Sequence, residues 1–239
     1  MKLVVTEKND AAQKIADLLG VKKPKADKVY STPVYRFDVD GEEWVTIGLR
    51  GHILEPDFAP TMVYKKRGGW QGVTEEGETP PAELPASLPK PPFKKKKPFT
   101  EDGVELKSWK MDALPYLVYA PINKLPKEKE IIRSLKNLAK KADSVSSATD
   151  FDREGELIGS EALSCIQEGK PTAPVSRARY SAFTKEEITH AFDNLVELDV
   201  NLASAGASRQ DIDLIWGAVL TRYLTLVKFA GYGNVRSSG

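Results

Sequence analysis

A dense run of carboxylates limits, more than any other feature, what this chain can fold into. The stretch "ATDFDREGELIGSEAL", residues 148 to 163, holds four acidic side chains within seven residues: Asp150, Asp152, Glu154 and Glu156. The preceding "SVSSATD" reads as a strand, and "REGELIGSEALSCIQEG" reads as a helix. The carboxylates therefore lie where a strand ends and a helix begins. Repulsion among them needs positive partners: Arg153 can screen one carboxylate, and a divalent cation could serve the rest.

Another acidic residue follows the first predicted strand. Residues 2 to 6, "KLVVT", are followed directly by Glu7 and Lys8 and then by the helical pattern of "AAQKIADLLG". Since ligands bind beyond the carboxyl ends of strands in α/β sheets, a parallel arrangement of the two strands would bring Glu7 to Asp150 and Asp152. Carboxylate oxygens at an open edge suit Mg²⁺, and Lys8 could stabilise charge on a phosphate oxygen. We expect a magnesium site; the simpler alternative is an acidic helix N-terminus stabilised by the helix dipole.

The other patterns up to about residue 60 are typical of an α/β sheet. Asn9 or Asp10 is expected to cap the first helix. The segment "YRFDVDGEEWVTIG" predicts a hairpin whose turn is Asp40-Gly41.

In the second half of the chain, helices dominate. Residues 127 to 143 predict a basic amphipathic helix, "RYSAF" a strand, and Thr184 with Glu187 a capping box. A final helix or helix pair over about residues 202 to 230 is expected to bury one stripe, made of Ile212, Ile215, Trp216, Val219, Tyr223, Leu226 and Val227.

Residues 60 to 105 differ in composition from the rest. They are rich in Pro, Gly, Glu and Lys and have no apolar period, which predicts a long surface insertion or a partly disordered loop. The run Lys94 to Lys97, flanked by Phe93 and Phe99, could grip a polyanion. The alternative is a solvated flexible loop.

Composition excludes several classes of protein. The net charge of +1 points to no particular partner. The single cysteine, Cys165, excludes an intramolecular disulfide, fits a reducing cytosol and lies in the register of a buried helical face. No run is apolar enough to cross a membrane, and no signal peptide is evident, so a soluble cytoplasmic protein is expected. The chain has no nucleotide P-loop and no Cys/His spacing for structural zinc.

Two of these segments resemble a known family. "VVTEKNDAAQKIADLLG" and "ATDFDREGELIGSEAL" are similar to the two halves of the Toprim domain, in the form found in type IA DNA topoisomerases. "RGHILEP" resembles the family's Gly-His-Leu segment. "SRQDIDLIWGAVLTRYLT" resembles the helical segment that follows Toprim, with Arg209, Asp213, Gly217, Thr221 and Arg222 in the expected spacing. The details are closer to the archaeal topoisomerase I and topoisomerase III branch.

The resemblance implies a fold and a domain plan. It implies an α/β Toprim fold, which is Rossmann-like, with a mainly parallel sheet flanked by helices, followed by an α-helical segment. Residues 1–170 would form the Toprim domain, with the Pro/Lys-rich insertion at about 60–105. Residues 171–239 would begin a mainly helical domain that lines a DNA groove.

The resemblance also implies a chemistry. The family cuts one DNA strand through a tyrosine, passes another strand through the gap and reseals it, with Mg²⁺ at the Toprim carboxylates. By matching position, Glu7, Lys8 and Arg153 would be catalytic, with Glu7 in acid–base work, Lys8 at the scissile phosphate, and Arg153 on phosphate or orienting a carboxylate. The metal would be held by Glu7, Asp150, Asp152 and Glu154. His52, Arg209, Asp213 and Arg222 would contact DNA, although Arg209 and Asp213 alone could equally be an ordinary helix-surface salt bridge.

One departure limits what the chain could do alone. None of its eight tyrosines stands in the family's catalytic motif, and Tyr180, Tyr223 and Tyr232 are expected to serve packing. We therefore expect the N-terminal part of a topoisomerase. Its partners would be single-stranded or underwound DNA and the remaining topoisomerase domains, from the same parent chain or a second subunit, in a cytoplasmic, nucleoid-associated location.

Two other functions are left open by the sequence. One is a Toprim nuclease that uses Mg²⁺-activated water without a tyrosine. The other is a non-catalytic DNA-binding module, held by Lys94 to Lys97 and by arginines: Arg177, Arg179, Arg209 and Arg222.

Overall fold

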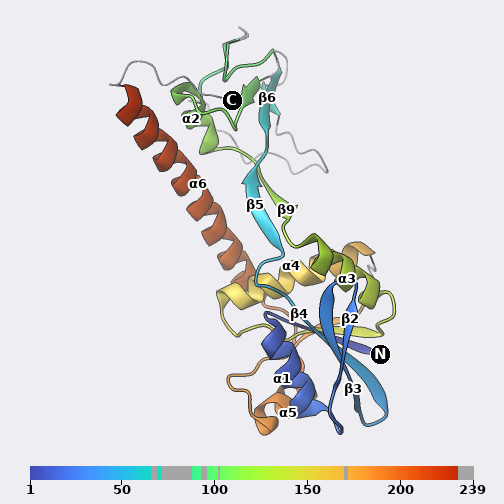
Figure 1. The fold of residues 1–239 in the computed structure, drawn as a ribbon. Coiled ribbons are helices and arrows are strands. Elements are labelled where there is room, and N and C mark those ends of the chain that lie inside the picture. Colours follow the sequence, from blue (N-terminus) through green and yellow to red (C-terminus); the bar gives the residue numbers. More distant parts are fainter. Residues whose placement is uncertain (66–68, 72–87, 93–95, 102, 170–171, 231–239) are drawn as a thin grey trace. The chain divides into compact units, whose positions relative to one another are not determined.

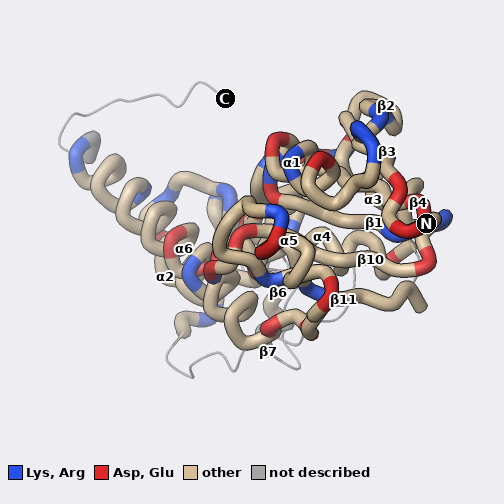
Figure 2. Tube along the Cα trace, turned by 90° about the horizontal axis from the view of Figure 1, so that it is seen from below, with Lys and Arg blue, Asp and Glu red and all other residues tan. Residues whose placement is uncertain are grey.

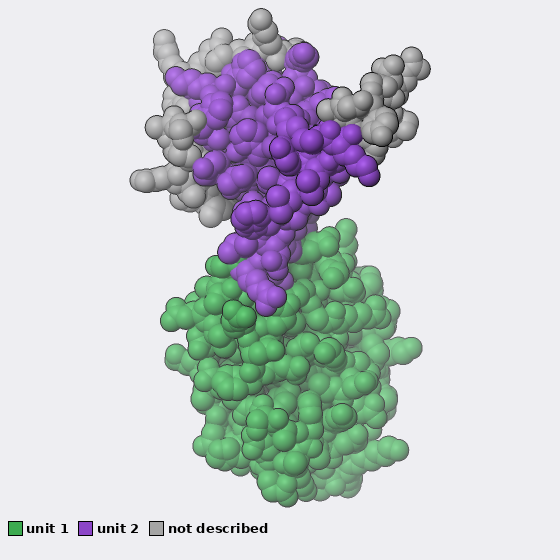
Figure 3. All heavy atoms as spheres, turned by 90° about the vertical axis from the view of Figure 1, so that its left-hand side faces the viewer, with its two compact units in different colours: residues 1–55, 126–208 green, residues 56–125, 209–239 purple. Residues whose placement is uncertain are grey.

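The chain divides into two compact units in a computed structural model, which describes residues 1–65, 69–71, 88–92, 96–101, 103–169 and 172–230. The first unit contains residues 1–55 and 126–208, and the second contains residues 56–125 and 209–239 (Figure 3). The domain division at residue 170 that the sequence suggested stays a prediction. Figure 2 shows Lys and Arg positions interspersed with Asp and Glu positions along the chain, whose net charge is +1.

The first unit is built on a six-stranded sheet in the order β11-β10-β1-β4-β3-β2 (Figure 1). Its strands are β1 (Lys2–Thr6), β2 (Lys25–Val29), β3 (Thr32–Val39), β4 (Glu42–Gly48), β10 (Ser144–Ser147) and β11 (Val175–Arg177). The pairs β11–β10, β10–β1 and β1–β4 are parallel, whereas β4–β3 and β3–β2 are antiparallel. The expected α/β fold with a mainly parallel sheet is confirmed.

Helices cover both faces of this sheet because the side chains of β1 alternate. Val4 packs on one face with α1 (Asn9–Leu19) and α5 (Lys185–Asp193). Leu3 and Val5 pack on the other face with α3 (Lys129–Ala139) and α4 (Arg153–Gly169). Helix α4 has the bounds expected from the sequence, and α3 is shorter than expected at both ends.

The hairpin between β3 and β4 forms at the expected turn. Asp40 and Gly41 both have positive φ, 51° and 84°, which a two-residue hairpin of the type I′ kind requires. The pairing of Val39 with Glu42 closes the turn.

Three local expectations for the first unit are wrong in detail. The N-cap of α1 is Lys8, without a side-chain hydrogen bond, rather than Asn9 or Asp10. Residues 179–183 form no strand, since β11 ends at Arg177. Thr184 does cap α5 through the Glu187 N–H, but the Glu187 carboxylate turns to Ser181 instead of completing a capping box.

The second unit has a core of its own. A three-stranded sheet, β7-β6-β8, contains β6 (Thr61–Lys65), β7 (Gly69–Gln71) and β8 (Gly103–Glu105). It is followed by η1 (Met111–Ala113) and α2 (Leu114–Leu117). Buried Met62, Val104, Leu106 and Leu117 belong to this core. Strands β5 (Leu54–Phe58) and β9 (Ile122–Pro126) pair with each other where the chain passes between the units.

The prediction that residues 60 to 105 form a structureless insertion is therefore partly wrong. Residues 61–65, 69–71 and 103–105 are strands, and Leu88 and Phe99 belong to the core of the second unit. Lys96 and Lys97 are exposed, while Phe93, Lys94 and Lys95 lie outside the described residues, so the polyanion grip stays a prediction.

The long helix α6 (Val200–Ala230) confirms the expected helix, but only three of the seven residues in the expected buried stripe pack against a core. Ile215, Val219 and Leu226 pack against the core of the second unit. The other members are exposed: Ile212, Trp216, Tyr223 and Val227. No helix in the described part of the chain is both long and apolar enough to cross a membrane.

Candidate functional site

The expected acidic site lies at one edge of the six-stranded sheet, where β1 and β10 end. These strands are parallel neighbours, with Val5 opposite Ser147, so Glu7 and Asp150 follow at the same edge. The helices that come next, α1 and α4, cover opposite faces of the sheet. Helices that leave to opposite faces open a crevice between two strand ends, which is where α/β sheets bind ligands. The parallel arrangement on which the sequence argument depended is confirmed.

The loop between β10 and α4 is fixed by hydrogen bonds and by a close approach of the backbone. Asp152 caps α4, because its Oδ1 accepts the Gly155 N–H at an N···O distance of 2.7 Å. The Thr149 hydroxyl donates to the Gly155 carbonyl at 2.6 Å. A Cβ on Gly155 would lie 2.0 Å from the Asp150 carbonyl oxygen. Only glycine lets the helix begin this close to the acidic loop.

A buried arginine holds the same loop from beneath. Arg177, fully buried at the end of β11, places Nε 2.8 Å from Glu156 Oε2, and Glu156 is also fully buried. Its Nη2 donates to the Asp150 carbonyl at 2.9 Å, and its Nη1 donates to the carbonyls of Ser147 and Ala178. The second Glu156 oxygen accepts the Asp199 N–H at 2.7 Å. Arg177 therefore shapes the backbone that presents Asp150.

This geometry corrects two interpretations of the sequence. Arg177 cannot be a DNA-binding arginine in this conformation, because none of its surface is exposed. Glu156, the last member of the acidic run, is neutralised by Arg177 and not by a cation in the crevice.

The charges at the sheet edge act on one another. Lys8 Nζ lies 3.1 Å from Glu7 Oε1. The pKa of Lys8 is raised, first by its hydrogen bond to Glu7 and also by the negative charges of Glu7, Asp150 and Asp152. Burial raises the pKa of Tyr180, and Asp150 raises it further. The negative charges of three carboxylates at this edge therefore act on the same ammonium group.

Glu154 has a partner in this conformation. Its Oε1 lies 2.5 Å from His52 Nε2, and His52 Nδ1 lies 3.0 Å from Glu161 Oε2 on the same helix. The hydrogen bond to Glu161 raises the pKa of His52 most, and burial opposes it. His52, which the resemblance places at the DNA, thus contacts α4 directly through two glutamates.

The donor set fits a hard divalent cation in kind. The Glu7 side chain is only 13% exposed, whereas Asp150 and Asp152 are exposed and face solvent at the sheet edge. Within the described residues, no three His, Cys, Asp or Glu side chains form a ready-made metal cage. Mg²⁺ usually keeps several waters among its ligands, so an open edge of oxygen donors suits it better than a closed cage.

Of the remaining candidates, Arg153 is next to the carboxylates in sequence, and the others belong to the second unit. Arg153 is exposed at the start of α4. Arg209 and Asp213, in the second unit, form an exposed ion pair at 3.8 Å. Arg222 is half-buried in that unit, donates to the Leu106 carbonyl at 2.6 Å and lies over the Trp109 ring. Their expected contacts with DNA stay predictions.

Sequence reasoning missed the residues that support the site. Tyr180 donates to the Ala148 carbonyl at 2.7 Å, and Glu161 fixes His52. A signal existed for Glu161, since it follows Glu154 by seven residues and two helical turns bring both onto one face. No local signal marked Arg177, whose partner Glu156 lies 21 residues away.

Comparison with known proteins agrees with the motifs. The family model for the Toprim domain matches residues 2–183. DNA topoisomerase 1 of Archaeoglobus fulgidus is 38% identical over 228 residues, which is 94% of this chain and 27% of that protein. DNA topoisomerase 1 of Thermoplasma acidophilum is 33% identical, with 94% of this chain and 23% of that protein covered. DNA topoisomerase 3-alpha of Homo sapiens is 30% identical, with 94% of this chain and 19% of that protein covered.

The chain thus spans about a quarter or less of the length of these three relatives. The Toprim match includes both β1 and β10, and hence Glu7 and the acidic loop. By a match that extends over most of its length, the chain belongs to the Toprim domain family, and the curated relatives that it resembles are DNA topoisomerases.

Proposed function

We propose that this chain is the Toprim-containing part of a type IA DNA topoisomerase, in which Mg²⁺ at the sheet edge supports cleavage and religation of one DNA strand. The observation that carries the proposal is the parallel pairing of β1 with β10, which brings Glu7 to the same edge as Asp150 and Asp152. The raised pKa of Lys8, caused by those carboxylates, supports a common site. The names of the relatives supply the reaction class.

Three carboxylates are the principal ligands that we assign to the metal. Glu7, Asp150 and Asp152 would hold Mg²⁺ together with water, and the bound ion would neutralise charge on a phosphate. Glu154 is paired with His52 in this conformation, so it would join as a further ligand only after leaving that partner.

The other side chains would position DNA and move protons. Lys8 is an exposed ammonium beside the acidic edge, suited to hold a phosphate oxygen. Glu7, in contact with Lys8, would serve in acid–base work at the leaving oxygen. Arg153 would contact phosphate at the start of α4. Arg209, Asp213 and Arg222 would contact single-stranded or underwound DNA, and the tyrosine nucleophile would come from another part of the enzyme.

In the deciding experiment, end-labelled single-stranded DNA is incubated with Mg²⁺ and the purified chain, and strand scission is measured. We expect binding without strand scission, because no nucleophilic tyrosine is assigned. Metal-dependent scission that yields free ends would favour the Toprim nuclease and overturn the proposal. Scission that leaves the DNA linked to the protein would mean that one of the chain's own tyrosines is the nucleophile.

Calorimetry with Mg²⁺ tests the metal assignment separately. Asp152→Asn should weaken Mg²⁺ binding, and Asp17→Asn, which removes an exposed carboxylate elsewhere in the first unit, is the matched control. Equal Mg²⁺ affinity in the two variants would overturn the assignment.

A further inference from the structure

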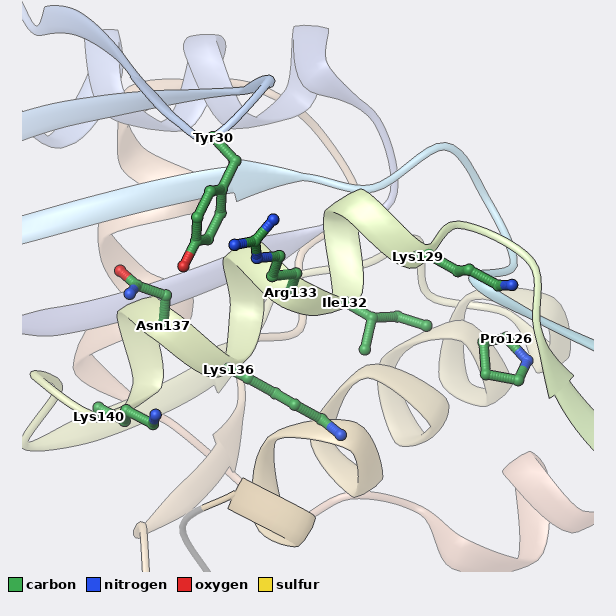
Figure 4. Close-up of a pocket in the computed structure, with 8 residues that line it drawn as sticks. All are labelled: Tyr30, Pro126, Lys129, Ile132, Arg133, Lys136, Asn137 and Lys140. Carbon is green, nitrogen blue, oxygen red and sulfur yellow. The ribbon is translucent and has the colours of Figure 1, made fainter.

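A basic hollow on the first unit is not explained by the carboxylate site. It has a volume of about 400 Å³ and lies along α3, where Tyr30 and Ile132 form part of its lining. Four of the residues that line it are basic: Lys129, Arg133, Lys136 and Lys140 (Figure 4). None of its lining residues is acidic, so the hollow is suited to an anion.

The basic residues share one face of α3 because of their spacing. They follow one another at intervals of four, three and four residues, which keeps them on one side of a helix. The opposite face is anchored in the core by Ile131, Leu135 and Leu138. The charged row is therefore fixed in place on a packed helix, and it extends over about 16 Å at 1.5 Å per residue.

Most of this charge is uncompensated. Lys136 Nζ lies 2.8 Å from Glu168 Oε2, so this lysine is already paired. In the part of the chain that the structure describes, no carboxylate forms an ion pair with Lys129, Arg133 or Lys140. Like charges at positions i and i+4 oppose helix formation, and a bound anion would relieve this repulsion.

The aromatic residue gives the hollow a defined shape. The Arg133 guanidinium lies 4.0 Å from the centroid of the Tyr30 ring, and Figure 4 shows the two side chains together above α3. This contact orients the planar guanidinium group, whose N–H donors suit phosphate oxygens. It also occupies one face of the ring, so backbone phosphate is a better ligand than a stacked base.

We propose that this hollow, outside the carboxylate site, binds the sugar-phosphate backbone of DNA without regard to sequence, through Lys129, Arg133 and Lys140. A row of about 16 Å can face several phosphates, since each strand of a duplex carries one phosphate per 3.4 Å or so of helix axis. That the phosphates belong to DNA rests on the proposed function; the preference for phosphate rests on the hollow itself.

The test measures DNA binding as a function of salt. Fluorescence anisotropy would use a labelled 25-base-pair duplex and one of its strands, in EDTA, so that no cleavage chemistry takes part. The triple variant Lys129→Gln/Arg133→Gln/Lys140→Gln is compared with Lys22→Gln/Lys23→Gln/Lys25→Gln, which removes the same charge from exposed positions elsewhere in this unit. Because all six side chains are exposed, melting curves should match that of the parent chain.

We expect the slope of log K against log salt to fall by about 2 to 3 in the first variant and to stay near the parent value in the second. Each single replacement should lower the slope by about 1. Equal losses in the two triple variants would mean diffuse attraction to any basic surface and would overturn the proposal, as would no loss in either. Labelled ATP, tested in parallel, separates free polyphosphate from a strand: binding of ATP without DNA would also overturn it.

The outcome is distinguishable from failure of the proposed function. Asp152→Asn should not lower the salt slope in EDTA, because that carboxylate contacts no phosphate without the metal. A variant that loses Mg²⁺ binding but keeps the slope, beside one that loses the slope but keeps Mg²⁺ binding, would separate the two sites.

Discussion

Arg177 Nε lies 2.8 Å from Glu156 Oε2, and neither side chain has any surface exposed to solvent. The pair ties β11 to α4, and Arg177 also donates to the Asp150 carbonyl at 2.9 Å. The acidic loop above this pair depends on it for its backbone geometry. A buried charge without its partner is strongly unfavourable, so the pair must be kept or lost as a unit.

Glu156→Ala should destabilise the chain by about 3–5 kcal/mol, because it leaves the Arg177 guanidinium buried and uncompensated. Urea denaturation, followed by circular dichroism, measures this loss. The double variant Glu156→Leu/Arg177→Met should recover much of the stability, since apolar groups replace both charges. The Mg²⁺ affinity of the double variant should nevertheless be lower than that of the parent chain, because the Asp150 carbonyl loses the hydrogen bond from Arg177. Full recovery of both properties would show that the pair does not shape the loop.

Asp152 has two separable roles, as a helix cap and as a metal ligand. Asparagine caps helices as well as aspartate does, so Asp152→Asn should keep the melting temperature, or raise it slightly by relieving repulsion, while weakening Mg²⁺ binding. Asp152→Ala loses the cap as well and should cost about 1 kcal/mol of stability. Differential scanning calorimetry and Mg²⁺ titration on both variants check this. A marked drop in melting temperature for Asp152→Asn would contradict the role of its Oδ1 as the acceptor for Gly155.

Local patterns predicted the parts of the fold that local chemistry determines. The Asp40-Gly41 turn, the bounds of α4 and the strand–acid–helix order needed only neighbouring residues. The placement of Glu7 and Asp150 at the same sheet edge was also predictable, because it needed only the assumption that β1 and β10 are parallel.

Features that depend on distant partners were missed. Strand β6 pairs with β8 some 40 residues later, and such short strands carry no recognisable period. Arg177 resembled a surface arginine because its partner is on another element. In α6 a stripe of apolar residues predicted burial, but Trp216 is 62% exposed because no described residue covers that side of the helix. Periodicity reports which face is apolar, and only packing decides whether it is buried.

Cys165 should be an inert thiol at neutral pH. It is 3% exposed, and burial raises its pKa from 9.0 to about 11. At pH 8 its thiolate fraction is about a hundredfold below that of a free cysteine, so a disulfide reagent should react slowly with the native chain and rapidly with the unfolded chain. Because the pKa of Cys165 is higher in the folded than in the unfolded chain, its buried neutral thiol contributes to the free energy of unfolding. This contribution is fully present below pH 9 and is lost as the pH rises towards 11.

The rate of reaction with a chromogenic disulfide reagent, measured from pH 7 to 10, checks the expectation for Cys165. Cys165→Ser provides the blank, and guanidinium-unfolded protein gives the reference rate. A native rate at pH 8 close to the unfolded rate would contradict burial of this thiol.

The segment around Leu88 tests how far the insertion belongs to the fold. Leu88 is 7% exposed in the core of the second unit, and Phe99 packs against the same core, with its ring centroid 6.2 Å from that of Tyr116. If residues 85 to 100 formed a surface loop, as their composition predicts, deleting them would leave the melting temperature nearly unchanged; the packing of these two side chains predicts a clear decrease instead. Leu88→Ala should lower the free energy of unfolding by about 2–5 kcal/mol, the range for a buried leucine, because it leaves a cavity.

Leu224→Ala, at a position that is 63% exposed, is the matched control and should change stability by less than about 0.5 kcal/mol. Chemical denaturation of the two variants decides the question: equal, small effects would place Leu88 outside the core and restore the interpretation of residues 85 to 100 as a surface loop.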